Sequence, residues 1–102
     1  MFRHIVLLTL TPETTADQRQ DLLAALATLP GRIDTIRHYS CGPDAGVNPG
    51  NADICAVGDF DDLAGYLVYR DHAAHKQVIA DHIAPHLAGR SAIQYTVPDE
   101  AA

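Results

Sequence analysis

The chain has 102 residues, with 7 Lys and Arg against 13 Asp and Glu, and a formal net charge of −6 at pH 7. This length allows one domain with a single core. The acidic balance, with no cluster of Lys and Arg, disfavours nucleic acid and anionic membrane surfaces as partners. The longest purely apolar run near the start, Ile5 to Leu8, is too short for a signal-peptide core or a membrane span, so a cytoplasmic protein is expected.

The first two elements are a strand and a capped helix. The β-branched and apolar stretch from Phe2 to Leu10 predicts a strand that ends at Thr11-Pro12. Thr15 followed three residues later by Gln18 has the spacing of a capping box and predicts a helix start. Leucines 22, 26 and 29 form an apolar stripe at helical spacing, and Pro30-Gly31 then ends the helix.

The rest of the chain completes a β-α-β-β-α-β order. We expect a strand over 33–41, a turn-rich loop over 42–51 and a strand over 53–60. A helix from Leu63 follows, capped by Asp61 or Asp62, and then a helical stretch from about 72 to 83 that Pro85 ends. The last expected element is a strand over 91–97. Residues 98–102 form a short polar tail that is expected to fray. The order predicts an α+β, ferredoxin-like subunit with an antiparallel four-stranded sheet.

The first strand is apolar on both faces, which bears on assembly. Phe2, His4, Val6, Leu8 and Leu10 share one face, and Ile5 and Leu7 lie on the other. The helical segments can cover only one face, so the other needs a partner, most simply an identical subunit packed sheet on sheet. The alternative is that neighbouring strands, through Arg37 and Gln94, keep the open face wet.

The two cysteines lie on either side of the turn-rich loop. A hairpin centred near Asn48 could bring Cys41 opposite Cys55, so a cross-strand disulfide is geometrically conceivable. A reducing compartment favours small, buried, apolar thiols instead. Two cysteines without a C-x-x-C spacing do not make a zinc site.

Four of the six histidines lie close together in the last third of the chain. One helical face carries His75, Ile79, His82 and His86. His82 and His86 have an i, i+4 spacing that could hold a transition metal. No Glu follows His82, and Pro85 disrupts the helix before His86, so a polar helix edge is the favoured interpretation. We therefore expect no metal and no cofactor.

Tyr69 and His75 are the best candidates for chemistry. A tyrosine supplies a hydrogen-bond donor, and a histidine supplies a general base that titrates near neutrality. On one unbroken helix the two side chains would stand roughly 120° apart, so they share a cleft only if the helix breaks near Asp71-His72. His4, early on the first strand, is the third candidate, with a single hydrogen-bonded, uninvolved histidine as the alternative.

Three stretches carry a resemblance to a known family: the opening Met1-Phe-Arg-His-Ile-Val-Leu-Leu, the closing Ile93-Gln-Tyr-Thr, and His72-Ala-Ala-His. Over residues 1–97 the chain resembles the stress-responsive dimeric α/β-barrel (Dabb) family. The resemblance implies a homodimer in which the two sheets form a barrel. In that family the last motif is commonly His-Pro-Ala-His, where the proline starts a new helix. Ala73 removes that forced break here.

The plant polyketide-cyclase branch of these barrels is similar at three positions: His4, Tyr69 and His75. The resemblance implies that the tyrosine and the last histidine form a proton-transfer pair for an intramolecular aldol cyclisation, without a cofactor. A pocket between the sheet and the Leu63–Ile83 helices would hold the ligand. Its expected ligand-binding residues are His72, Val6, Tyr66 and Ile79.

Three functional hypotheses follow. The first is a pocket for a hydrophobic, carbonyl-bearing molecule, with cyclase-like proton transfer by His75, Tyr69 and His4. The second is a non-enzymatic, stress-associated structural dimer, and the third is a cofactor-free monooxygenase by fold analogy. A catalytic pocket predicts a perturbed pKa for His75 and a cavity reaching Tyr69, whereas a structural dimer predicts a filled interior.

Overall fold

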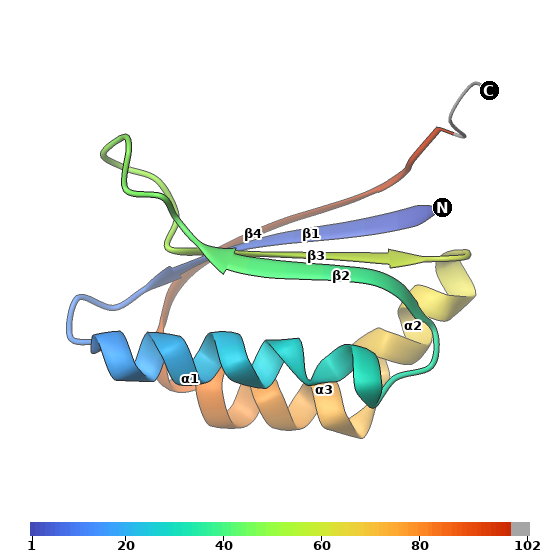
Figure 1. Ribbon diagram of the computed structural model, residues 1–102, viewed down its shortest axis with the longest axis horizontal. Coiled ribbons are helices and arrows are strands. Elements are labelled where there is room, and N and C mark those ends of the chain that lie inside the picture. The colour runs from blue at the N-terminus through green and yellow to red at the C-terminus, as the bar shows by residue number, and fades with distance from the viewer. Residues whose placement is uncertain (99–102) are drawn as a thin grey trace.

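The computed structural model describes residues 1–98, which form an antiparallel four-stranded sheet with all helices on one face (Figure 1). The elements are β1 (Phe2–Leu10), α1 (Ala16–Ala27), η1 (Leu29–Gly31), β2 (Ile36–Pro43), β3 (Ile54–Phe60), α2 (Leu63–Asp71), α3 (Ala73–Val78), η2 (Ile79–Ile83), η3 (Ala84–His86) and β4 (Leu87–Thr96). The strand order β2-β3-β1-β4 is that of a ferredoxin-like fold, as the sequence predicted. The predicted tail falls mostly on residues 99–102, which lie outside the described residues.

α1 begins with the predicted capping box. The Thr15 hydroxyl accepts a hydrogen bond from the Gln18 backbone N–H at 3.1 Å, and the Gln18 side chain accepts one from the Thr15 N–H at 2.9 Å. Leu22 and Leu26 are buried on the face of α1 that packs against the sheet. The helix therefore supplies one side of the core.

Three strands differ from their predicted bounds: β3 starts one residue later than predicted, at Ile54, and the starts of β2 and β4 differ by more. β2 starts at Ile36 instead of Ile33, because residues 33–35 form a turn in which the Ile36 N–H donates to the Ile33 carbonyl at 3.3 Å. β4 starts at Leu87 instead of Ser91, because its pairing with β1 extends as far as Leu10. The longer β4 places Arg90 on an edge strand of the sheet, where the sequence suggested only a connecting segment.

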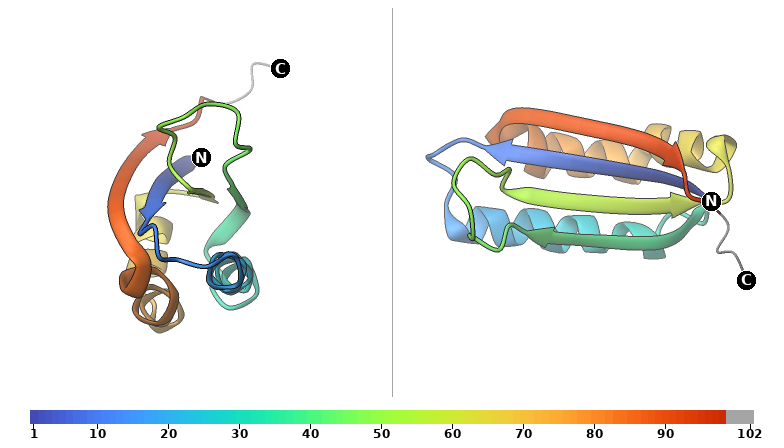
Figure 2. Two further views of the ribbon diagram at one scale, coloured as in Figure 1. Left: turned by 90° about the vertical axis from the view of Figure 1, so that its left-hand side faces the viewer. Right: turned by 90° about the horizontal axis from the view of Figure 1, so that it is seen from above.

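The side chains of β1 are divided between the two faces of the sheet as predicted. His4, Leu8 and Leu10 are buried beneath the helices, whereas Leu7 lies on the opposite, open face and is 41% exposed. Figure 2 shows this open face from above, with the helices beneath the strands.

The alternative in which Gln94 helps to keep the open face wet is wrong. Gln94 pairs with His4 across β1 and β4 and donates a hydrogen bond to the His4 ring, so its side chain lies on the helix side. Ile93 and Tyr95 face the open side instead, with exposures of 57% and 40%. The open face is therefore more apolar than Gln94 suggested.

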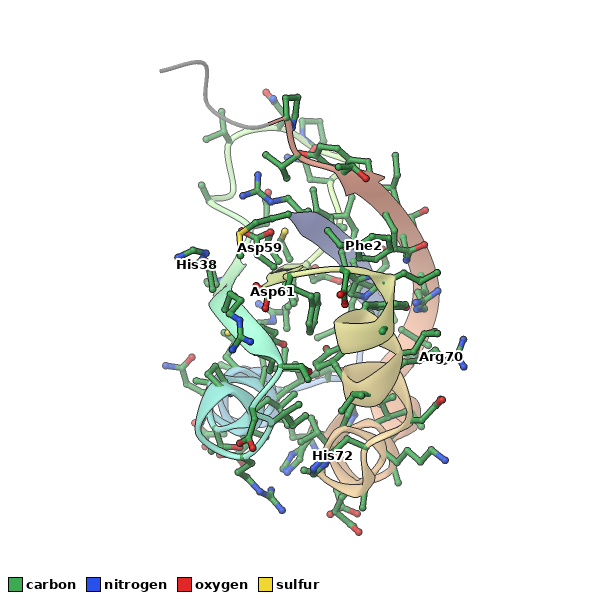
Figure 3. The ribbon with its side chains drawn as sticks, turned by 90° about the vertical axis from the view of Figure 1, so that its right-hand side faces the viewer. Phe2, His38, Asp59, Asp61, Arg70 and His72 are labelled. Atoms are coloured by element: carbon green, nitrogen blue, oxygen red, sulfur yellow. The ribbon has the colours of Figure 1, made fainter. Side chains whose placement is uncertain are left out.

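One end of the open face is polar. Arg3 forms a two-point ion pair with the buried Asp59 carboxylate, at 2.7 and 2.9 Å. The exposed His38 imidazole lies 3.8 Å from the same carboxylate (Figure 3). The Arg3 guanidinium holds the pKa of Asp59 below its usual range.

The cysteines do not meet in this register. Cys41 is opposite Ala56, and Cys55 is opposite Gly42, so the two thiols lie on opposite faces of the sheet. Both are free. The Cys41 sulfur lies 3.8 Å from the Leu23 carbonyl oxygen beneath the helices, and burial raises the pKa of its thiol.

The second helical region is a chain of short pieces. Asp62 caps α2 by accepting from the Gly65 N–H at 2.9 Å. Asp61 does not act as the cap; it pairs with Arg37 at 2.9 and 3.0 Å. The predicted helical stretch over 72–83 is confirmed by α3 and the π turn η2, which together cover 73–83. Pro85 lies in the 3₁₀ turn η3, which ends at the next residue, His86. No helix in residues 1–98 is long and apolar enough to cross a membrane.

Candidate functional site

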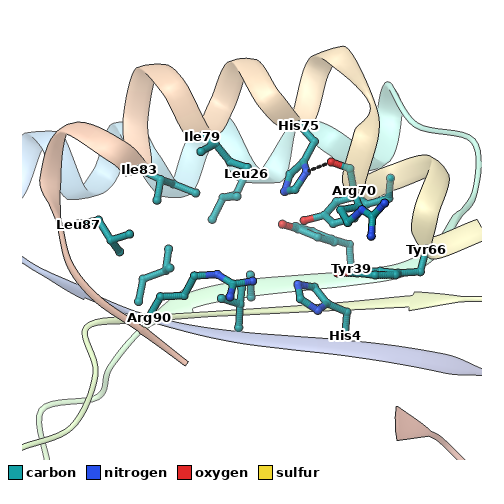
Figure 4. A pocket seen from close by; sticks show the side chains of 14 residues that line it. His4, Leu26, Tyr39, Tyr66, Arg70, His75, Ile79, Ile83, Leu87 and Arg90 are labelled. Atoms are coloured by element: carbon teal, nitrogen blue, oxygen red, sulfur yellow. Dashed lines mark hydrogen bonds between the residues drawn. The ribbon is translucent and has the colours of Figure 1, made fainter. Parts of the chain in front are cut away.

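A cavity of about 260 Å³ lies between the helix side of the sheet and the α2–η2 helices. One half is aliphatic and the other half is polar (Figure 4). The aliphatic half contains Val6, Leu8, Leu26, Ile79, Ile83 and Leu87. The polar half contains His4, Tyr39, Tyr66, Tyr69, Arg70, His75 and Arg90.

Tyr69 and His75 meet in this cavity because the helix breaks between them. His72 has an extended backbone (φ −66°, ψ 139°) and serves both as the C-cap of α2 and as the N-cap of α3. The rings of Tyr69 and His75 consequently lie 4.2 Å apart, centroid to centroid. On an unbroken helix the two rings could not meet. The helix break that lets them meet is present here without a proline.

The His72 side chain makes this break. Its Nδ1 accepts a hydrogen bond from the Ala74 N–H at 3.0 Å, in the manner of a side-chain N-cap. The ring is thereby committed to the helix junction (Figure 3), and His72 is not among the residues that line the cavity. The other expected ligand-binding residues, Val6, Tyr66 and Ile79, do line it.

The hydrogen bond at His75 determines which nitrogen is free. His75 Nδ1 lies 3.0 Å from the Arg70 carbonyl oxygen (Figure 4). A carbonyl only accepts, so Nδ1 carries the proton and Nε2 of the neutral ring keeps its lone pair. Burial lowers the pKa of His75. The ring is therefore neutral at pH 7, with an unprotonated nitrogen available as a base.

His4 has the opposite arrangement. The Gln94 amide nitrogen donates to His4 Nδ1 at 2.8 Å, so the neutral ring carries its proton on Nε2. The pKa of His4 is lowered to about 4, mainly by burial and further by the positive charge of Arg90. His4 is therefore a neutral N–H donor at pH 7.

Tyr69 is a second donor. It is 3% exposed, and burial raises its phenol pKa, so the hydroxyl keeps its proton at neutral pH. Its ring packs against Phe60 at 5.2 Å and Tyr66 at 6.2 Å. These contacts hold the phenol in place on the sheet side of His75.

The sequence did not indicate Arg70 on α2 as a cavity residue, nor Tyr39 and Arg90, which come from strands. The Tyr39 hydroxyl is buried without a hydrogen-bond partner among the described residues, and burial raises its pKa. Arg90 enters the cavity from β4 (Figure 4). Strand alternation could have placed both on the helix side, but only once the register of β2 and β4 was known.

The remaining histidines stay outside the cavity. His82 and His86 are not among its lining residues. Within residues 1–98 no group of three or more His, Cys, Asp or Glu side chains is arranged to hold a metal. The cavity thus brings together one proton acceptor, His75, and two neutral donors, Tyr69 and His4. The phenols of Tyr39 and Tyr66 and the guanidinium groups of Arg70 and Arg90 lie beside them.

Comparison with known proteins gives a family. The model of the stress responsive A/B barrel domain (Dabb) matches residues 2–97. No curated protein matches the sequence.

Several solved structures share the fold. A dimeric ferredoxin-like protein of unknown function from Thermobifida fusca YX is 38% identical, over 94% of this chain and 90% of its own, with a TM-score of 0.87. A dimeric protein of unknown function from Bacteroides fragilis NCTC 9343 is 25% identical, over 94% and 95%, with a TM-score of 0.79. A hydroxynitrile lyase from Passiflora edulis is 16% identical, over 96% and 94%, with a TM-score of 0.82, which shows the fold alone.

Proposed function

Because this chain belongs to the stress responsive A/B barrel domain family, we propose that it binds a small hydrophobic carbonyl compound and catalyses cofactor-independent proton transfer on it. The observation that carries the proposal is the pairing of an unprotonated His75 with the protonated Tyr69 hydroxyl across a ring distance of 4.2 Å. A base beside a donor is the minimum that enolate chemistry needs.

The proposed step starts at a carbon next to a carbonyl group. His75 Nε2 takes a proton from that carbon, and the C–H electron pair becomes the enolate. The enolate oxygen accepts a hydrogen bond from the Tyr69 hydroxyl, with the His4 N–H as a second donor.

In a compound with a second carbonyl, the enolate carbon attacks that carbonyl carbon, and a carbon–carbon bond forms. The new alkoxide takes the proton back from the His75 imidazolium. This is a cyclase-like aldol closure with no net oxidation or reduction.

The cavity also supports a catalytic ligand site over a purely structural role. A structural dimer predicts a filled interior and ordinary histidine titration. The protein instead has a cavity of about 260 Å³, and burial lowers the pKa of both histidines that line it. Cavities of this kind with convergent polar groups are typical ligand sites.

The test measures proton exchange and does not require the product to be known. Exchange of the α-protons of 2-octanone in D₂O, monitored by NMR, should be accelerated by the protein. His75→Ala should abolish the acceleration because it removes the base. Tyr69→Phe should reduce it by a factor of roughly 10²–10³ because it removes one enolate donor.

His82→Ala is the matched control, since His82 lies in the following helical turn and outside the cavity. It should exchange 2-octanone at the wild-type rate. Equal rates in wild type and His75→Ala, with both proteins folded, would contradict the assigned base.

We further propose that the protein is a homodimer joined through the open sheet faces. The exposed side chains of Leu7, Ile93 and Tyr95 form an apolar surface there. The Thermobifida and Bacteroides proteins with the same fold are dimeric. Burial of these side chains against a second copy would give the hydrophobic free energy that a stable dimer needs.

We place the protein in the cytoplasm on the basis of its thiols. Cys41 and Cys55 lie on opposite faces of the sheet and are both free. A pair of unbridged cysteines is typical of a reducing compartment.

A further inference from the structure

Arg90 is exposed and lies at the edge of the cavity, where it has no acidic counter-ion within residues 1–98. The lining includes two arginines and no Asp or Glu. Arg70 is neutralised by Asp71, which accepts from its guanidinium at 2.9 and 3.0 Å. Arg90 forms no ion pair with any acidic side chain in residues 1–98. The cavity therefore has a net positive charge in a protein whose overall charge is −6.

The sheet register explains why this charge reaches the cavity. Arg90 is opposite Leu8, whose side chain is buried beneath the helices, so the Arg90 side chain leaves β4 on the same side. Figure 4 shows its guanidinium extending over the floor of the cavity toward His4. Its stem lies along the aliphatic half, and its charge borders the polar half.

The groups around the Arg90 guanidinium cannot neutralise its positive charge. His4 and His75 are both neutral at pH 7, and the charge of Arg90 contributes to the lowered pKa of each. The nearby phenols of Tyr39 and Tyr69 keep their protons because burial raises their pKa values. An anion is the species that this side of the cavity lacks.

We propose that Arg90 forms an anion-binding subsite and that the ligand is an amphipathic carboxylate with an aliphatic chain. This inference rests on the proposed ligand site and names its substrate class: carbonyl compounds that also carry a carboxylate. The guanidinium binds the carboxylate, and the leucine and isoleucine side chains of the aliphatic half cover the chain.

The lining favours a carboxylate over a phosphate. One guanidinium offers a planar pair of N–H donors, which matches the two oxygens of a carboxylate. A phosphate dianion would need a second cation, and the other arginine of the lining is already paired with Asp71. No lysine lines the cavity.

The test uses two probes that differ only at the head group, octanoate and octanamide, measured by titration calorimetry. Wild type should bind octanoate about tenfold more tightly, since a partly solvated charge-assisted pair is worth about 1.4 kcal/mol. Arg90→Gln should bind the two probes equally and keep the wild-type affinity for octanamide.

Arg32→Gln is the charge-matched control, because Arg32 is exposed and lies outside the cavity. It should keep the tenfold preference. Equal binding of the two probes by wild type, retention of the preference in Arg90→Gln, or no binding of either probe would each overturn the inference.

The result of the octanoate binding test can be distinguished from the result of the 2-octanone exchange test. Octanoate has no ketone, so its binding reports the anion subsite and not proton transfer. Proton exchange of 2-octanone, which has no carboxylate, reports the catalytic pair and not Arg90. Loss of the octanoate preference with intact 2-octanone exchange would therefore reject the subsite alone.

Discussion

His4 and His75 are two neutral imidazoles that carry their protons on different nitrogens. The Arg70 carbonyl fixes the proton of His75 on Nδ1, and the Gln94 amide fixes that of His4 on Nε2. Two chemically identical side chains thus offer an acceptor and a donor to one cavity. The difference comes entirely from the partner that each ring has at its other nitrogen.

The burial of His4 makes the stability of the protein depend on pH. Its pKa falls from 6.5 to about 4 on folding, so below pH 6.5 the unfolded chain binds a proton that the folded protein does not. The stability contribution is present above pH 6.5 and is lost as the pH falls toward 4. From pH 7 to pH 4.5 we expect a loss of about 2 kcal/mol from this group.

Urea denaturation of wild type and His4→Asn at both pH values isolates this effect from that of the carboxylates. The variant should lose less stability than wild type over the same interval, by about 2 kcal/mol. Equal losses in the two proteins would show that His4 titrates normally.

At the scale of elements, the junction at His72 positions the site. A single side chain ends α2 and starts α3, and its backbone turns the chain so that His75 lies over Tyr69. Helices of 9 and 6 residues have little intrinsic stability, so their caps weigh heavily.

Replacement of His72 by alanine removes the α3 cap without touching the cavity lining. We expect His72→Ala to lower the free energy of unfolding by about 1 kcal/mol and to slow 2-octanone exchange, because His75 is held less well. Adding Ala73→Pro should restore both, since proline at the first helical position favours a helix start. Urea denaturation and the exchange assay measure the two effects.

Thr15→Ala is the matched control for this pair, since it removes the cap of α1, which is far from the His75 junction in sequence. It should cost similar stability and leave exchange unchanged. If His72→Ala weakens stability alone, then the junction does not position His75.

Local sequence signals predicted the elements well. The β-branched run of β1 gave both of its bounds, and the Thr15–Gln18 spacing gave the start of α1, because both depend on residues close in sequence. The predicted helix end at Pro30-Gly31 is wrong, because α1 ends at Ala27 and Leu29–Gly31 form the separate 3₁₀ turn η1. The sequence left open whether the helix breaks, since alanine at position 73 gives no signal and the cap is a hydrogen bond from the Ala74 N–H to the His72 ring.

The polar half of the cavity was predicted only in part. The family resemblance pointed to His4, Tyr69 and His75. The positions of the Arg90, Tyr39 and Gln94 side chains depend on strand register, which brings together residues as distant in sequence as His4 and Gln94, 90 positions apart. Periodicity within one strand cannot supply that information.

At the scale of the whole molecule, the proposed homodimer depends on the open sheet face. Ile93 is 57% exposed near the middle of β4 and faces away from the helices. A lysine there would bring a charge into the proposed interface, where it would have no partner. We expect Ile93→Lys to convert the dimer to a monomer, as measured by size-exclusion chromatography with light scattering.

Val68→Lys provides the comparison, because Val68 is 50% exposed on α2 and lies away from the open face. This variant should remain dimeric. A dimeric Ile93→Lys protein, or a monomeric wild type, would reject the sheet-face interface.

The two faces of β1 border two different surfaces of the molecule, the cavity and the open sheet face. Its even-numbered side chains, among them His4 and Val6, border the cavity, and its odd-numbered ones, among them Ile5 and Leu7, border the open face. Substitutions at alternate positions can therefore vary one surface and leave the other intact. A single-residue insertion or deletion within this strand would exchange the two sets, so length changes in β1 should be tolerated far less than changes of residue type.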